Sequence, residues 1–313
     1  MNSTVVYALF PVISIIIIGV GIAKMKWVSQ TSINDLSNLV FYVLTPALLF
    51  RTMIGVKLVD LDFTPIAVYF LAVALVFIAT ILLHGFSTIS SARALANTFS
   101  NTVMIGIPLI SLVYGEDGLV TLFTLISIHA LVLMTGGTIV FEFAVARQAG
   151  REGATSNMGR TLSVAIKNSV LHPIPIPIFA GLIYAQIGIP LPEMVDKPLQ
   201  LMGQALGPMS LLLVGVTLAY SRLSGNMLAA IRIAVVKTII HPAIFVACAW
   251  LLGLRGIPMA TMAMVAALPV GANVFMFTQH YKIAEDEISA SIAISTILCL
   301  FSLPIILMML GHY

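Results

Sequence analysis

The sequence NTVMIGIP, Asn101 to Pro108, lies inside an apolar stretch, residues 92–114, that is long enough to cross a bilayer. A helix in lipid keeps its backbone hydrogen bonds internal, because hydrocarbon supplies no partners. Here Pro108 lacks a backbone donor and Gly106 adds backbone freedom, while Asn101 and Thr102 bring polar side chains. The stretch is therefore predicted to form a broken helix.

A second apolar stretch, in the other half of the chain, is interrupted in the same way. Residues 259–281 contain LPVGAN, residues 268–273, with Pro269, Gly271 and Asn273. Broken backbone at membrane depth is tolerated where it is buried in protein or lines a water-filled cavity. Two broken spans in corresponding positions of two halves indicate the binding site of a transporter.

Composition sets the class of protein. Of the 313 residues, 60% are hydrophobic and only 9% are charged, and the mean hydropathy is +1.09. An ordinary soluble domain has about 25% charged residues, so we predict an all-α polytopic membrane protein surrounded by the lipid bilayer. The net charge of +3 is too small to indicate a nucleic-acid partner. The two cysteines, Cys248 and Cys299, fall in apolar spans, so we expect no disulfide, no metal site and no other cofactor.

The chain contains ten candidate spans of roughly 20 residues, the length that crosses a bilayer. They are residues 5–23, 33–54, 63–84, 92–114, 119–146, 172–189, 192–220, 227–252, 258–281 and 288–310. Pro11 precedes Gly19 by eight residues in the first span, and Pro173 precedes Gly181 by eight in the sixth. Because five is odd, a repeated set of five spans must be inverted in the membrane. We therefore predict a first five-helix repeat, a cytoplasmic connecting loop and a second, inverted five-helix repeat at residues 1–146, 147–163 and 164–313.

The basic residues predict the orientation. With the N-terminus outside, the inner loops and inner helix ends hold Lys24, Lys26, Arg93, Arg147, Arg151, Arg160, Lys167, Arg222, Arg232 and Lys282. The outer ones hold only Arg51, Lys57, Lys197 and Arg255. Because basic residues concentrate on the cytoplasmic side, both termini are predicted to lie outside the cytoplasmic membrane.

Five stretches of the sequence resemble the auxin efflux carrier family, and the resemblance covers essentially the whole chain. They are LSNLVFYVLTPALLF at 36–50, FSNTVMIGIPL at 99–109, GQALGPMSLLLVGVTLA at 203–219, KTIIHP at 237–242 and AALPVGAN at 266–273. The resemblance implies ten helices in two inverted repeats, with helices 4 and 9 crossed and partly unwound. It also implies a scaffold domain, a transport domain that moves as an elevator, and a homodimer. Bacterial members are similar to carriers of malonate, malate and other small organic acids.

Asn101 and Asn273 are the leading candidates for substrate binding. Their amides either face a substrate or a co-transported ion, or they cap the free backbone ends at each break, since Asn is a good cap. Both roles can coexist. Thr102 and Gly271 lie in the same two breaks and are assigned to substrate binding with them.

Pro108 and Pro269 complete the predicted substrate site. Each removes a backbone donor, which we expect to free a carbonyl and end a half-helix. An anion would favour the half-helix N-termini, near Leu109 and Asn273, and a cation would favour the freed carbonyls. The alternative is a plain proline kink, which is common in membrane helices.

Asn38 and Gln204 form a second set of candidate substrate-binding residues. They share their helices with Pro46 and Pro208, respectively. They either form a second polar layer or hydrogen-bond between helices as packing contacts.

Lys237, His241 and His129 are candidates for ion or charge coupling, to a proton or to sodium. Lys237 either responds to an anionic substrate or extends toward the cytoplasmic interface. His241 lies four residues further along the same helical face, and His129 lies in the middle of the fifth span, either titrating near neutral pH or satisfied in the core. No Asp or Glu lies deep in a predicted span, so a proton relay of embedded carboxylates is not indicated.

Together these features predict a secondary transporter that moves a small organic anion, a dicarboxylate or similar weak acid, by an elevator mechanism. The alternative is an efflux carrier for an aromatic, auxin-like weak acid. A channel or a sensor is a less favoured alternative. An enzyme is not indicated, because the sequence contains neither HExxH nor GxSxG.

Overall fold

The computed structural model describes residues 2–56, 61–152, 175–221 and 225–310. Within these ranges the chain is mostly helical and contains no β-strand, in agreement with the predicted all-α polytopic membrane class. Lys57, Arg160, Lys167, Arg222, Pro173 and most of the predicted connecting loop lie outside the described residues.

The elements follow one another along the chain in this order. They are α1 (Asn2–Lys24), α2 (Ser32–Leu39), η1 (Val40–Leu44), α3 (Thr45–Met53), α4 (Thr64–His84), α5 (Thr88–Thr98), η3 (Thr102–Gly106), α6 (Ile107–Glu152), α8 (Pro175–Ile187), α9 (Glu193–Tyr220), α10 (Met227–Val235), η4 (Val236–Ile240), α11 (His241–Leu251), α12 (Gly256–Ala267), α13 (Ala272–Tyr281) and α14 (Glu285–Leu310). The three η elements are π-helical turns inside longer helices.

Six continuous helical stretches of the described chain are long and apolar enough to cross a membrane. They are Ser32–Met53, Thr64–His84, Thr102–Arg147, Glu193–Tyr220, Met227–Leu251 and Glu285–Leu310. Shorter apolar helices occur at Phe10–Lys24, Ile176–Ile187 and Gly256–Ala267, which overlap the predicted first, sixth and ninth spans. The end of the predicted span 4 and the whole of the predicted span 5 fall in the stretch Thr102–Arg147. Gly115 divides this stretch, because its φ of 60° and ψ of −144° are not helical. Beyond Gly115 α6 runs to Glu152, past the predicted end of the fifth span at residue 146.

Each π-helical turn ends two residues before a proline. The prolines are Pro46, Pro108 and Pro242. The N–H of the residue before each proline bonds to a carbonyl five residues back, as Ile107 does to Thr102. A π turn inserts one extra residue into the helix, and here it carries the chain past a proline that cannot donate. The expectation that Pro108 ends a half-helix is therefore wrong: Pro108 lies inside a continuous helix, and the break comes earlier, at residues 99–101.

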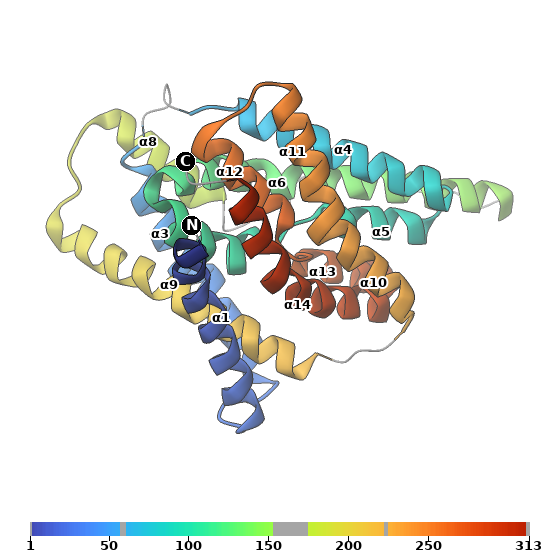
Figure 1. Cartoon of the computed structure of the whole chain (residues 1–313), viewed down its shortest axis with the longest axis horizontal. Helices are drawn as coiled ribbons and strands as arrows, with labels where there is room; N and C mark the ends of the chain where they lie inside the picture. The colour runs from blue at the N-terminus through green and yellow to red at the C-terminus, as the bar shows by residue number, and fades with distance from the viewer. Residues whose placement is uncertain (1, 57–60, 153–174, 222–224, 311–313) are drawn as a thin grey trace.

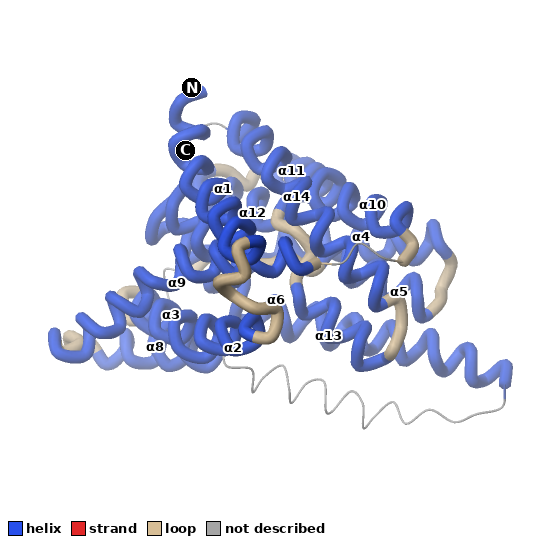
Figure 2. The backbone as a smooth tube through the Cα atoms, turned by 90° about the horizontal axis from the view of Figure 1, so that it is seen from below, coloured by secondary structure: helices blue, strands red, loops and turns tan. Residues whose placement is uncertain are grey.

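The helices pack as two bundles (Figures 1 and 2). We call α1, α2, α3, α8 and α9 the first bundle, and α4, α5, α6 and α10 to α14 the second, because helices of each set pack mainly on one another. Helices α1 and α9 cross so closely that a Cβ on Gly19 would collide with the carbonyl of Leu212, and one on Gly215 with that of Ile16. The start of α1 and the end of α14 lie near each other in both views.

Among the described residues, one paired ion bridge joins two helices of each bundle. Arg51 of α3 donates from Nε and Nη2 to the carboxylate of Asp196 in α9, at 2.7 and 3.2 Å. Arg93 of α5 donates in the same way to Glu287 of α14, at 2.6 and 2.8 Å. Two parallel bonds fix the angle between the partners, so each bridge holds its own bundle together.

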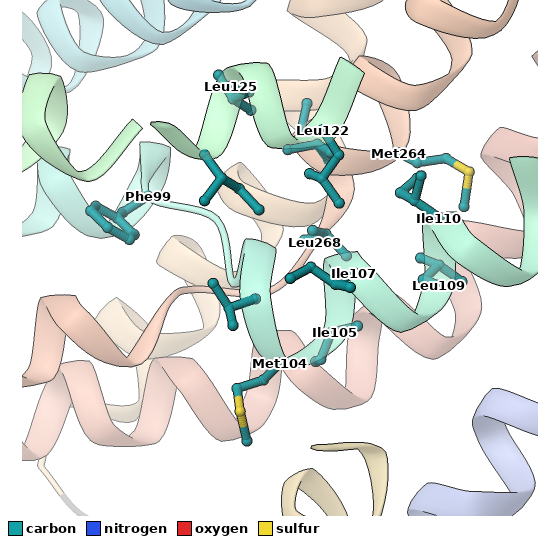
Figure 3. Close-up of a cluster of buried hydrophobic side chains, with 14 of the residues drawn as sticks. Phe99, Met104, Ile105, Ile107, Leu109, Ile110, Leu122, Leu125, Met264 and Leu268 are labelled. Atoms are coloured by element: carbon teal, nitrogen blue, oxygen red, sulfur yellow. The ribbon is translucent and has the colours of Figure 1, made fainter. Parts of the chain in front are cut away.

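A dense cluster of apolar side chains surrounds the first break (Figure 3). Met104, Ile105 and Ile107 pack beside Leu268 of the second broken span, with Leu122 of α6 nearby. In lipid there is little water to exclude, so such packing stabilises by close contact of many atoms. The cluster holds the two breaks against each other.

Candidate functional site

The two breaks meet and hydrogen-bond to each other. The N–H of Asn101 donates to the carbonyl of Pro269 at 2.9 Å, and the N–H of Gly271 donates to the carbonyl of Phe99 at 2.9 Å. These bonds form an antiparallel bridge between Ser100 and Val270. Each break thus supplies the partners that the other lacks, which is how unwound backbone persists without lipid exposure.

Two serines satisfy further backbone groups at the bridge. Ser100 Oγ donates to the carbonyl of Val265 at 2.8 Å, and Ser295 Oγ accepts from the N–H of Val270 at 3.1 Å. The Ser100 hydroxyl also lies 3.0 Å from the hydroxyl of Tyr69. A Cβ on Gly271 would lie 2.7 Å from the ring of Phe99, so only glycine allows the two segments to approach this closely.

Asn101 caps the helix that follows the first break. Its side-chain oxygen accepts from the N–H of Met104 at 3.3 Å, so η3 and α6 begin at Thr102 and not at Leu109 as expected. The cap predicted as one alternative for Asn101 is therefore present. Asn101 also lines a cavity, and its amide nitrogen has no hydrogen-bond partner among the described residues.

Asn273 differs from Asn101 because it does not cap. Helix α13 begins at Ala272 with Gly271 as its N-cap, which places Asn273 in the first helical turn, as expected for a half-helix N-terminus. Asn273 is half-buried, lines the same cavity as Asn101, and has no side-chain hydrogen bond to any described residue.

The cavity at the bridge has a volume of about 40 Å³, which is room for a few water molecules. It brings together Asn101, Thr102, His129, Gly271 and Asn273 from the predicted site. Aromatic side chains from η1 and from the first break, Phe41 and Phe99, complete much of its wall. Apolar walls with a few convergent polar groups are typical of small-molecule sites.

A larger groove separates the two bundles. It has a volume of about 510 Å³ and lies between α1, α3 and α9 on one side and the start of α6 on the other. Pro108, Gln204 and Pro208 line this groove and not the cavity. Asn38 is exposed on α2 and lines neither space.

Lys237 is fully buried beneath the second break. Its Nζ donates to the carbonyl of Ala266, in the last turn of α12, at 2.6 Å. The extension of Lys237 toward the membrane interface, one of the two expectations for this residue, is therefore wrong. Lys237 is not one of the described residues that line the cavity at the bridge.

Tyr69 joins the two candidate histidines. Its ring centroid lies 5.6 Å from that of His241 and 5.9 Å from that of His129, and its hydroxyl is 3.4 Å from His129 Nε2. His129 lines the cavity, whereas both ring nitrogens of His241 are buried without a hydrogen-bond partner in the described chain.

Sequence reasoning missed Tyr69, Ser100, Ser295 and Phe41. Ser100 is adjacent to the quoted motif, and its neighbour Asn101 was a signal for it. Tyr69 lies in an otherwise uncharged span, where a tyrosine is more often a membrane-interface residue. Ser295 is brought to the break only by the packing of α14.

Comparison with known proteins gives one consistent result. The model of the family described as "Membrane transport protein" matches residues 4–307. A "Putative malonate transporter" of Rhizobium meliloti (strain 1021) is 25% identical over 296 residues, which cover 92% of this chain and 90% of the relative.

Two further relatives align with part of the chain. "Auxin efflux carrier component 8" of Arabidopsis thaliana is 24% identical over 239 residues, covering 64% of this chain and 65% of the relative. An "Uncharacterized transporter" of Methanothermobacter thermautotrophicus is 24% identical over 213 residues, covering 67% and 65%. With a family match over nearly its whole length, the chain belongs to the membrane transport protein family that includes the auxin efflux carriers, and it is a multi-pass transporter and not an enzyme.

Proposed function

We propose that this protein is a secondary carrier that moves a small organic anion, a dicarboxylate or similar weak acid, across the cytoplasmic membrane. The observation that carries the proposal is the cavity at the paired breaks. Two helices, one starting at Thr102 and one at Ala272, begin beside this cavity. Helix N-termini carry partial positive charge and unpaired N–H groups, so they attract anions.

The amides of Asn101 and Asn273 supply the specific contacts. Both residues line the cavity, and neither amide nitrogen has a partner among the described residues. None of the described residues that line the cavity is Lys or Arg, so neutral donors and helix ends provide the attraction. A hydrogen bond to a charged ligand contributes about 1.5–3 kcal/mol.

Elevator-type movement of the second bundle along the first is the proposed transport step. The groove of about 510 Å³ between the bundles supports it, as does the confinement of each described ion bridge to one bundle. The cavity lies at the boundary, because Phe41 lies in η1 between α2 and α3 of the first bundle, whereas Asn101 lies between α5 and α6 of the second bundle and Asn273 lies in its α13. Gln204 and Pro108 would line the path through the groove.

Ten spans in two inverted repeats, with both termini outside, remain part of the proposal. Glycine contacts between the halves support it. Gly19 of α1 packs against α9, and Gly181 of α8 packs against Phe50 and Met53 of α3. A two-fold relation that exchanges α1 with α8 and α3 with α9 produces this pairing, as inverted repeats require.

A small dicarboxylate is the favoured substrate. The small cavity and the relative named "Putative malonate transporter" support this choice. An aromatic weak acid is the second candidate, because Phe41 and Phe99 line the cavity and another relative is named an auxin efflux carrier component.

Counterflow in proteoliposomes tests the proposal. Vesicles are loaded with unlabelled malonate, malate or indole-3-acetate, and labelled acid is added outside. We expect saturable uptake that is stimulated by internal malonate. Uptake that does not saturate and is not stimulated from inside would identify a channel, and no exchange of any acid would refute the carrier function.

A homodimer built on the first bundle is also proposed. The family resemblance of the sequence supports it, and exposed apolar side chains of α1, α8 and α9 such as Ile17, Phe179 and Met194 would form the contact. Mass measurement of the protein in nanodiscs is expected to give two chains per particle, and one chain per particle would contradict this.

A further inference from the structure

Lys237 occupies the place where a coupling cation would be expected. The last carbonyls of a helix carry partial negative charge, and in transporters the carbonyl ends of interrupted helices hold sodium ions or protons. The carbonyl of Ala266 is such a group, because α12 ends at Ala267 just before the break. Lys237 Nζ donates a hydrogen bond to it at 2.6 Å.

The surroundings of Lys237 lack a fixed negative charge. The titratable groups packed around it are Tyr69 of α4, His129 of α6, His241 of α11 and Cys299 of α14. None of these described neighbours is an Asp or Glu. A buried ammonium without a counter-ion is costly, whereas a neutral amine is not. An anion in the nearby cavity would supply the missing charge.

We infer that Lys237 is the site of a transported proton, bound when the anion binds and released when it leaves. The inference rests on the proposed function as an anion carrier, and it excludes sodium from the same carbonyl. Proton uptake forms one N–H bond on the Lys237 amine, and release breaks that bond and returns the proton to water. No other bond changes, so one proton accompanies each anion.

Exchangeable groups connect Lys237 with the cavity. His241 lies next to it with both ring nitrogens unpartnered and fully buried, and Tyr69 contacts that ring. The Tyr69 hydroxyl in turn lies 3.4 Å from His129, which lines the cavity. These rings pack between the buried amine and the proposed anion site, and the described hydrogen bonds join only Tyr69 and His129 among them.

Nitrogen NMR of the protein labelled with ¹⁵N-lysine tests the protonation without any substrate. The Lys237 side-chain signal is identified by its loss in Lys237→Gln. We expect it to change between ammonium and amine within a titration from about pH 5 to about pH 9. A signal that stays ammonium, or stays amine, over this range would overturn the inference.

Proton movement with malonate is the second test. Proteoliposomes that contain a pH dye are given labelled malonate outside, in sodium or in choline buffer. We expect the wild-type lumen to acidify as malonate enters, equally in both buffers. Lys237→Gln is expected to exchange malonate with lower affinity, because it lacks the charge that stabilises the bound anion, and to lose the acidification. Lys237→Arg, which keeps a cation that does not release its proton, should keep malonate exchange and also lose the acidification.

Arg232→Gln is the matched control, because Arg232 is an exposed cation on the neighbouring turn of the same span. It should behave as wild type. Wild-type acidification in Lys237→Gln, or uptake that needs sodium, would overturn the inference and leave the carrier function intact. If no variant moves malonate, the proposed substrate is wrong, and the NMR titration alone decides the role of Lys237.

Discussion

The two broken spans use the same residue types in opposite order and in different ways. In the first, Asn101 comes before Gly106 and Pro108, whereas the second runs Pro269, Gly271, Asn273. Asn101 caps its helix and Pro108 is absorbed by a π turn. In the second break Pro269 lies in the unwound segment, where its carbonyl accepts the Asn101 N–H.

This difference shows that a proline does not mark the position of a break. The breaks lie where each segment can bond to the other, at Phe99–Asn101 and at Leu268–Gly271. The two asparagine side chains consequently make different hydrogen bonds. Asn101 has both a structural bond and a free amide, while Asn273 has no side-chain bond to a described residue.

Replacing each asparagine by alanine should distinguish their roles in anion binding and in stability, and it gives the largest expected effects. Each of Asn101→Ala and Asn273→Ala removes a donor to a charged ligand, which lowers affinity about tenfold to a hundredfold. Asn101→Ala also removes a helix cap and should cost about 0.5–2 kcal/mol of stability. Counterflow kinetics and thermal unfolding of both variants check this.

The control for the asparagine variants is Met276→Ala, at an exposed position of α13. It should leave half-saturation and melting temperature near wild type. Equal loss of stability in both asparagine variants would contradict the distinction between them.

Replacing the glycine of each break by alanine should lower the stability of the protein by different amounts. A Cβ at Gly271 meets the Phe99 ring at 2.7 Å and the Ser100 carbonyl at 3.1 Å, whereas one at Gly106 meets only the tip of Leu268 at 2.9 Å. We expect Gly271→Ala to cost about 1–3 kcal/mol, the usual cost of overpacking. Gly106→Ala should cost less, because the Leu268 side chain can turn away. Melting temperatures in detergent measure both, and a more damaging Gly106→Ala would contradict the geometry.

The two serines at the bridge should differ from each other in their effect on stability. Ser100→Ala removes a bond to the Val265 carbonyl, and Ser295→Ala leaves the N–H of Val270 without its acceptor. Leaving a buried donor unpaired costs about 1–3 kcal/mol, while a typical hydrogen bond contributes about 1 kcal/mol. Ser295→Ala is therefore expected to melt below Ser100→Ala, and the reverse order would show that Ser100 holds the bridge.

The sequence was sufficient to locate both breaks and to choose five residues of the cavity. It was sufficient because Asn, Gly and Pro fall together in each break, and broken backbone in a membrane is tolerated only where protein or a cavity covers it. It could not show that Pro108 is accommodated, because a proline in an apolar run can either interrupt the helix or follow a π turn that keeps the helix continuous. It could not show that Lys237 points inward, because its partner Ala266 is 29 residues away and meets it only through packing.

The central claim is that the paired amides bind the anion by donation. Asn273→Asp tests it most directly, because the two side chains have nearly the same shape, and the change removes the donors and adds negative charge. We measure counterflow of the acid that the wild-type protein exchanges best, with correct folding confirmed by an unchanged melting temperature. We expect Asn273→Asp to lose exchange and therefore to be more strongly impaired than Asn273→Ala. Exchange at the wild-type rate in Asn273→Asp would contradict it.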